Sequence, residues 1–95
     1  MTNKYEIKRS KQYKKDFKRI VAEGRNIHKL EEVINILAAG LTLPDSYCDH
    51  RLKGNWKDFR ECHIEFDWVL VYRKYKNELV LFLTRTGSHT EVLNL

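Results

Sequence analysis

The chain has 95 residues, of which 42% are hydrophobic and 33% are charged, and it carries a net charge of +5. This mixture is typical of one small globular domain, residues 1–95, and excludes an intrinsically disordered chain. No apolar stretch is long enough for a transmembrane helix, and none follows the first charged residues, so we expect neither membrane contact nor a signal peptide. The two cysteines, Cys48 and Cys62, are too few for a disulfide framework, and we expect free thiols and a cytoplasmic protein.

The positive charge is concentrated at the start of the chain. Residues 1–25 contain nine Lys or Arg and three acidic residues, which gives +6, whereas residues 26–95 contain nine and ten, which gives −1. A basic segment of this kind attracts a polyanion such as nucleic acid, or an acidic protein. Charge alone leaves a third interpretation open, a lysine-rich helix face that only contacts water.

The first elements predicted are one strand and two helices. Residues 4–9 alternate between polar and apolar side chains, which predicts a strand. Ser10 is a suitable N-cap for a helix of about 14 residues that Gly24 ends, and Asn26 is a suitable N-cap for a second helix that Gly40 ends. The apolar stripe of the first helix consists of Tyr13, Phe17, Ile20 and Val21. Together the two helices form a hairpin.

The second half of the chain predicts three strands. Residues 41–55 contain turn-forming residues and are expected to form a loop. Strands are predicted over 59–65, 68–75 and 78–84, and the connectors are short enough for an antiparallel meander. The order β-α-α-β-β-β predicts an α+β fold, with the helix hairpin packed on one face of a mostly antiparallel sheet and the other face at least partly open.

Three histidines stand in segments that are far apart along the chain. His50 lies in the predicted loop, His63 in the first strand of the meander, and His89 after a Thr-Gly-Ser turn. Alternation along 59–65 puts His63 on the more polar face of its strand. Asp67 follows this strand, and Arg85 ends the last one. Imidazoles, a carboxylate and a guanidinium are the groups that cleavage of an RNA phosphodiester requires without a metal ion.

The same side chains could also form a zinc site, stack on bases or contact phosphate. A zinc site from Cys48, His50, Cys62 and His63 is opposed by their spacing, because adjacent strand residues face opposite sides, and we expect no metal and no cofactor. Aromatic side chains could stack on bases or pack in the core, and packing is the expectation for most of them, although Trp68 could border a site. Residues 51–57, which include Lys53, could contact phosphate or form a plain exposed turn.

Several motifs together resemble a known family. The stretch 47–72 contains Asp49-His50, Leu-Lys-Gly-x-Trp56, Arg60-Glu-x-His63 and Asp67-Trp68, and the chain continues with Arg85-Thr-Gly-Ser-His89. This combination resembles the YafQ family of bacterial toxins, within the RelE/ParE superfamily. The resemblance covers nearly the whole chain, since the first helix and Leu43-Pro44 also agree.

The resemblance implies a RelE-like fold and the toxin half of a type II toxin–antitoxin pair. Such toxins resemble small endoribonucleases that cut messenger RNA in the ribosomal A site and thereby inhibit translation. The positions that match the family's catalytic residues are His50, His63, Asp67, Arg85 and His89. Substrate binding is assigned to Trp68, Lys53, Arg60, Lys11, Lys14, Lys15 and Lys18. The implied partners are an acidic antitoxin, ribosomal RNA and messenger RNA. One departure is Leu93, near which family members often place an aromatic residue.

The mechanism predicted is attack by a ribose 2′-hydroxyl. His89 is the general acid, on a C-terminal segment expected to be mobile, and Arg85 and His50 hold the phosphate. The general base is either Asp67 or His63, and the sequence does not decide between them. Two alternatives are a non-catalytic module that binds RNA or the ribosome, and a ParE-like inhibitor of DNA gyrase. The three histidines argue against the second, because that role needs no acid–base groups.

Overall fold

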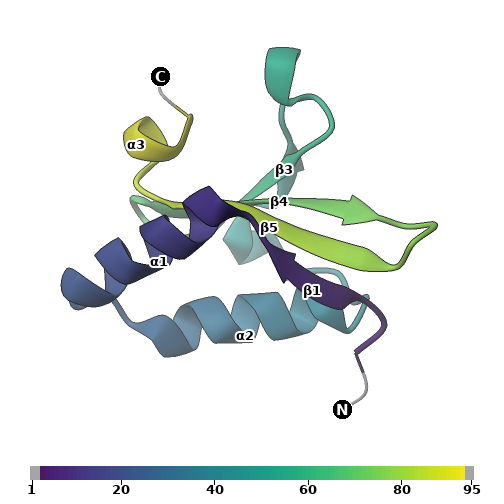
Figure 1. Ribbon diagram of the computed structural model, residues 1–95, viewed down its shortest axis with the longest axis horizontal. Helices are drawn as coiled ribbons and strands as arrows, with labels where there is room; N and C mark the ends of the chain where they lie inside the picture. Colours follow the sequence, from purple (N-terminus) through teal and green to yellow (C-terminus); the bar gives the residue numbers. More distant parts are fainter. Residues whose placement is uncertain (1–2, 94–95) are drawn as a thin grey trace.

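The structure is a computed structural model that describes residues 3–93, and it has helices on both faces of one sheet (Figure 1). None of the helices within those residues has the length and apolar character needed to cross a bilayer. In chain order the elements are β1 (Glu6–Arg9), α1 (Lys11–Ala22), α2 (Ile27–Ala38), the 3₁₀ turn η1 (Asp45–Tyr47), β2 (His50–Arg51), the 3₁₀ turn η2 (Gly54–Trp56), β3 (Arg60–Glu65), β4 (Trp68–Tyr75), β5 (Val80–Gly87) and α3 (His89–Leu93).

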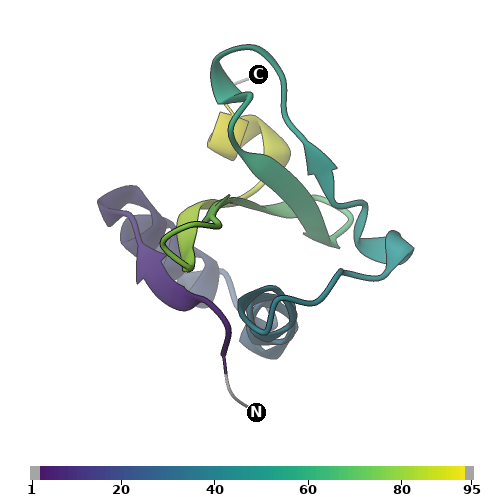
Figure 2. The same ribbon diagram turned by 90° about the vertical axis from the view of Figure 1, so that its right-hand side faces the viewer.

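The five strands form one mixed sheet in the order β1-β5-β4-β3-β2. β1 pairs with β5 in parallel, and all other pairs are antiparallel. The α+β fold with a mostly antiparallel sheet is therefore confirmed. In Figure 2, α2 lies below the sheet, while α3 and the loop that carries η2 lie above it.

Both helix starts are confirmed at the residues that the sequence indicated. Ser10 Oγ accepts a hydrogen bond from the Tyr13 amide at 2.8 Å, and Asn26 Oδ1 accepts one from the His28 amide at 3.1 Å. The predicted stripe of α1 is wrong at one position, because Val21 is 51% exposed. Asp16, which was not assigned to the stripe, is buried instead.

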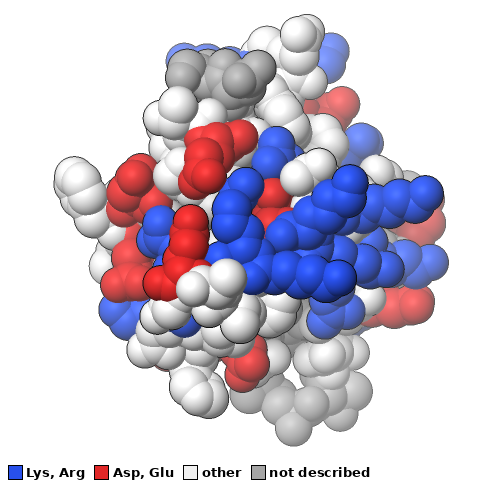
Figure 3. Space-filling model, turned by 60° about the vertical axis from the view of Figure 1, so that its left-hand side comes forward, with Lys and Arg blue, Asp and Glu red and all other residues white. Residues whose placement is uncertain are grey.

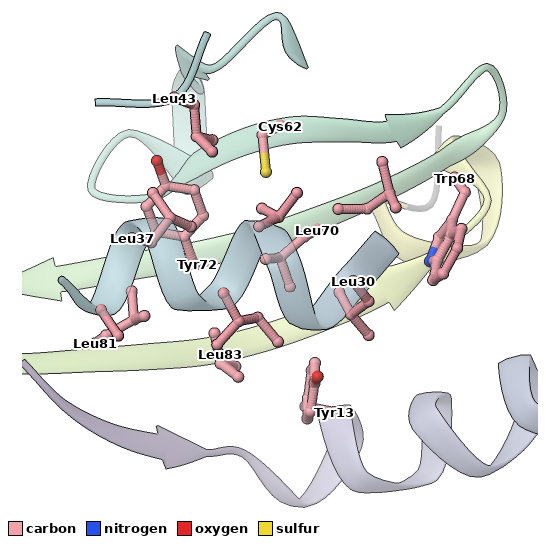
Figure 4. Close-up of a cluster of buried hydrophobic side chains, with 14 of the residues drawn as sticks. Tyr13, Leu30, Leu37, Leu43, Cys62, Trp68, Leu70, Tyr72, Leu81 and Leu83 are labelled. Atoms are coloured by element: carbon pink, nitrogen blue, oxygen red, sulfur yellow. The ribbon is translucent and has the colours of Figure 1, made fainter. Parts of the chain in front are cut away.

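The main core lies between the helices and the sheet (Figure 4). Leu30 and Leu37 of α2 pack in one buried cluster with Cys62, Leu70 and Leu83 from the three central strands. Cys62 and Ile64 thus take the core face of β3, as alternation predicted. The opposite side of β3 carries Glu61 and His63, so the alternation of this strand separates the core from the polar side chains.

The second face of the sheet is more covered than the sequence indicated. Val69 and Val71 of β4 pack there against Val92 and Leu93, with Leu52, Trp56 and Phe59 at the border. Residues 89–93 form α3, which buries Val92 and Leu93 on the sheet. The predicted loop 41–55 likewise contains β2 and two 3₁₀ turns. β5 begins at Val80 because residues 76–79 form the turn.

A bulge in β5 decides which face Arg85 occupies. Val71 pairs with Arg85, whereas the next residue, Tyr72, pairs with Leu83, so Thr84 is the extra residue. Without it, Arg85 would share the core face with Leu83, because residues two apart on a regular strand point the same way. The bulge turns Arg85 to the face that carries Val71 and Glu61.

Candidate active site

Three imidazoles surround one carboxylate, that of Glu61. The Nε2 atoms of His50 and His63 lie 3.6 and 3.4 Å from Glu61 Oε1, and Nε2 of His89 lies 3.2 Å from Glu61 Oε2. The rings of His50 and His63 are tilted, with centroids 6.3 Å apart. The structure therefore brings together the three histidines that the sequence singled out.

The three rings come from three different elements of the fold. His50 pairs directly with Glu61 across β2 and β3, and His63 lies two residues beyond Glu61 on the same face of β3. His89 begins α3 and comes from the far edge of this face. The turn into α3 uses Gly87 at φ +148, a backbone conformation that L side chains rarely adopt. This glycine lets the chain turn from β5 over the sheet.

Glu61 is buried while the rings around it are accessible. Its side chain is 2% exposed, whereas those of the three histidines are 36–49% exposed. Within residues 3–93, Glu61 Oε2 has no hydrogen-bond donor. A buried carboxylate is costly unless groups that can carry positive charge lie beside it, and the imidazoles are such groups. The result is three solvent-accessible acid–base groups arranged around one buried carboxylate.

His50 has an oxygen atom beside each ring nitrogen. Its Nδ1 lies 2.7 Å from the carbonyl oxygen of Cys48, and its Nε2 faces Glu61. The contact with the carbonyl orients the ring so that its Nε2 faces the site, which suits the predicted contact of His50 with a phosphate.

Arg85 lies in the same cross-strand row as Glu61, with Val71 between them. Two strand spacings put its backbone about 10 Å from that of Glu61. Its Nε and Nη2 donate to the two oxygens of Asp16 at 2.9 and 3.1 Å. The hydrogen bonds with Asp16 raise the pKa of Arg85 against the effect of burial, so the guanidinium stays cationic.

Asp67 and Lys53 are both exposed. Asp67 lies in the turn between β3 and β4, and no ion pair or hydrogen bond within residues 3–93 joins its carboxylate to the imidazoles. Lys53 shares a cavity of about 350 Å³ with His50, Trp56 and Leu93. Lys53 therefore lies near His50, whereas Asp67 is near His63 in sequence and makes no such bond to an imidazole in the described part of the chain.

Two predicted substrate-binding residues do not fit that role. Trp68 is fully buried, and its Nε1 donates to Thr86 Oγ1 at 2.9 Å, so its ring packs in the core and is not available to a base (Figure 4). Arg60 shares the face of Tyr72 and Cys62, opposite Glu61, and its Nε and Nη2 donate to Asp49 at 3.3 Å. Alternation along β3 aims Arg60 away from the imidazoles.

The lysines of α1 are exposed, whereas Arg19 is half-buried. Lys and Arg side chains gather in a band across one face of the molecule (Figure 3). The exposed lysines of α1 are Lys11, Lys14, Lys15 and Lys18.

Sequence reasoning gave no role to Glu61 and Asp16, although both are central to the site. The signal for Glu61 was available, since a strand residue two positions before His63 must share its face. Asp16 had a weaker signal, an acid at helical spacing from Ile20. Despite the gathering of histidines, no group of three or more His, Cys, Asp or Glu side chains in the described part of the chain is arranged to hold a metal ion.

The chain is similar to characterised toxins over most of its length. It is 40% identical over 85 residues to the mRNA interferase toxin YafQ of Escherichia coli K12, covering 88% of this chain and 90% of that protein. The toxin in the E. coli DinJ–YafQ toxin–antitoxin complex superposes with a TM-score of 0.84 and 36% identity, over 93% of this chain and 96% of the other. A metal-bound toxin from Helicobacter pylori gives 0.86 and 46%, over 92% and 97%.

Residues 5–94 also match the family described as the bacterial toxin of type II toxin–antitoxin system, YafQ. The family match and the superposed toxin structures identify the same family, and the three gathered histidines are the ones that stand in the motifs resembling it. The chain therefore belongs to the YafQ family of bacterial type II toxins.

Proposed function

We propose that the chain is an endoribonuclease toxin that cuts messenger RNA in the ribosomal A site and so inhibits translation. The observation that carries this proposal is the convergence of His50, His63 and His89 on buried Glu61. A binding module without catalysis has no need for three accessible acid–base groups around one anion. The 40% identical relative is named an mRNA interferase, which supports the same substrate class.

The reaction is an internal displacement at phosphorus. The ribose 2′-oxygen loses its proton to a general base and bonds to the adjacent phosphorus, and the bond to the 5′-oxygen of the next nucleotide breaks. That oxygen takes a proton from a general acid. The products are a 2′,3′-cyclic phosphate and a free 5′-hydroxyl, and no metal ion is required for either proton transfer.

We assign the general acid to His89 and phosphate binding to Arg85 and His50. His89 is nearly half exposed and stands at the first position of α3, where its ring can reach a bound leaving group. Arg85 is a permanent cation in the row that crosses the same face of the sheet. Such groups offset the charge that grows on the phosphoryl oxygens.

The test is cleavage of a programmed ribosome complex by the purified protein, with sequencing of the RNA ends. His89→Ala is expected to lower the rate about 10²- to 10⁴-fold with an unchanged thermal unfolding midpoint. His28→Ala is the matched control, because that ring is 92% exposed on α2 and Glu31 is its ion-pair partner among residues 3–93. Ends that carry 3′-hydroxyl and 5′-phosphate, or a fully active His89→Ala protein, would reject the mechanism.

The general base remains a choice between His63 and Asp67. His63 touches Glu61, and Asp67 lies two residues before Val69, the cross-strand partner of His63. Comparison of His63→Ala with Asp67→Asn separates them. Replacement of the residue that acts as the base should remove the limb of the pH–rate profile that its deprotonation produces. Replacement of the other residue should leave that limb in place.

We also propose that an acidic antitoxin binds a groove between α1 and α2. The groove encloses about 440 Å³, and apolar side chains such as Phe17 and Ile27 line it together with three basic residues and one acidic residue, namely Arg9, Lys14, Lys18 and Glu31. An amphipathic acidic helix would complement both features. Phe17→Glu should weaken the complex with the antitoxin encoded beside the toxin, and Leu79→Glu, in the turn before β5, should not. Equal affinities would reject this groove as the site.

A further inference from the structure

Asp16 is a single buried acid in a helix whose surface is basic. Its side chain is 1% exposed, and it accepts hydrogen bonds from several groups at once. The donors are Arg85 Nε at 2.9 Å, Arg85 Nη2 at 3.1 Å, Gln12 Nε2 at 3.1 Å, the Thr86 amide at 3.2 Å and Arg19 Nη2 at 3.4 Å. Two of the five come from one guanidinium, so the pair is bidentate and fixes the plane of Arg85.

The contacts of Arg85 leave part of its guanidinium unused. An arginine has five N–H donors, and Asp16 takes one from Nε and one from Nη2. A third, from Nη1, reaches the carbonyl oxygen of Val92 at 3.4 Å. After the contacts with the described residues 3–93, one N–H on each terminal nitrogen remains for a phosphate oxygen.

The helix that carries Asp16, α1, is itself bonded to the sheet and to α3. Ser10 Oγ, at the start of α1, donates to the carbonyl oxygen of Thr84 at the bulge, at 2.6 Å. Arg19, one turn after Asp16, lies 3.5 Å from Glu91 of α3. Asp16 thus belongs to a connected polar cluster that spans α1, β5 and the helix that carries His89, and it cannot move without its neighbours.

We propose that Asp16 is a positioning residue for cleavage, which holds the Arg85 guanidinium in the orientation that meets the scissile phosphate. The inference rests on the proposed ribonuclease function and adds a residue on α1 to its site. Without the carboxylate, the arginine side chain is free to rotate, and the phosphate contact must be formed at a cost in ordering during the reaction.

The role predicts a specific kinetic signature. Displacement of a catalytic contact by about 1 Å can cost about 10²-fold, so Asp16→Asn should lower kcat by about 10- to 100-fold. The same change removes a negative charge near the RNA, so KM should stay the same or fall. General damage to the fold would instead raise KM and lower kcat to the same extent whether or not Arg85 is present.

The experiment is a double-mutant cycle on the purified full chain, measured as ribosomal mRNA cleavage. Asp16→Asn is made in the natural protein and in Arg85→Gln. If Asp16 acts through Arg85, its replacement costs less than about threefold in the second background. Glu23→Gln is the matched control, because it removes the same charge at the end of α1, where the Glu23 side chain pairs with Arg25 and with no other described residue.

The results distinguish failure of this inference from failure of the proposed function. A loss of kcat in the natural background that disappears in Arg85→Gln supports the inference. The same loss in both backgrounds, or an unchanged kcat, overturns it while leaving the ribonuclease proposal intact. If Asp16→Asn does not fold, Asp16→Glu, which keeps the charge and shifts the carboxylate by one methylene, takes its place in the same cycle. Absence of cleavage by the natural protein rejects the proposed function instead.

Discussion

Glu61 Oε2 and His89 Nε2 lie 3.2 Å apart, although one belongs to a central strand and the other to a helix of five residues. A helix this short is not stable alone, so its position depends on tertiary contacts. Val92 and Leu93 bury its apolar side, and Glu61 faces its first ring. All three imidazoles therefore face the same carboxylate, that of Glu61.

Replacement of Glu61 by Gln should disorder the three rings without changing the shape of the site. We expect mRNA cleavage to fall by about 10- to 100-fold, because the acid and the phosphate-binding imidazole lose the negative charge that both of them face. The measurement is the single-turnover rate on programmed ribosomes. Glu65→Gln is the control, since that carboxylate on the same strand is exposed and pairs with the surface residue Lys29. A Glu61→Gln protein at full rate would show that the carboxylate is dispensable.

Tyr72 should stabilise the segment that leads into His50. Its hydroxyl donates to Asp49 Oδ1 at 2.6 Å, and Asp49 directly precedes His50. Burial raises the pKa of Tyr72, so the hydroxyl keeps its proton and remains a donor. Tyr72→Phe should cost about 1–2 kcal/mol of unfolding free energy in urea titrations. Tyr75→Phe, on the same strand, should cost less, and equal losses would contradict this assignment.

Acid should destabilise the protein through Asp16. Burial raises the pKa of this carboxyl, but hydrogen bonds from Arg85, Gln12 and the Thr86 amide outweigh it and lower the pKa below the ordinary 3.8. A lowered folded-state pKa gives stability that is present above 3.8 and is lost as the pH falls through the folded value. Unfolding free energies measured from pH 5 to pH 2 should therefore fall less steeply for Asp16→Asn. An identical slope in the two proteins would contradict the prediction.

The four lysines of α1 should supply the electrostatic part of ribosome binding. Their joint replacement by Gln should weaken binding. It should also make the slope of log K against log salt less steep, by an amount that corresponds to the loss of up to about four phosphate contacts. The measurement is binding to ribosomes across a salt series. Replacement of Lys4, Lys8 and Lys76, which are exposed outside α1, serves as the control. An unchanged slope would reject α1 as the docking surface.

The sequence alone determined the features that depend on short-range periodicity. Ser10 and Asn26 cap the helices because their side chains reach amides two or three residues ahead. His63 faces away from the core because strand side chains alternate. The family motifs then pointed to His50 and His89, without any information about how the segments meet.

Tertiary structure decided everything that depends on which segments meet. A two-residue strand such as β2 exists only through its pairing with β3, and a single extra residue, Thr84, sets the face of Arg85. The same non-local packing buries Trp68, turns Arg60 toward Asp49 and inserts Asp16 between α1 and β5. Local patterns fix the direction of a side chain relative to its own element, whereas register, bulges and packing fix what that side chain meets.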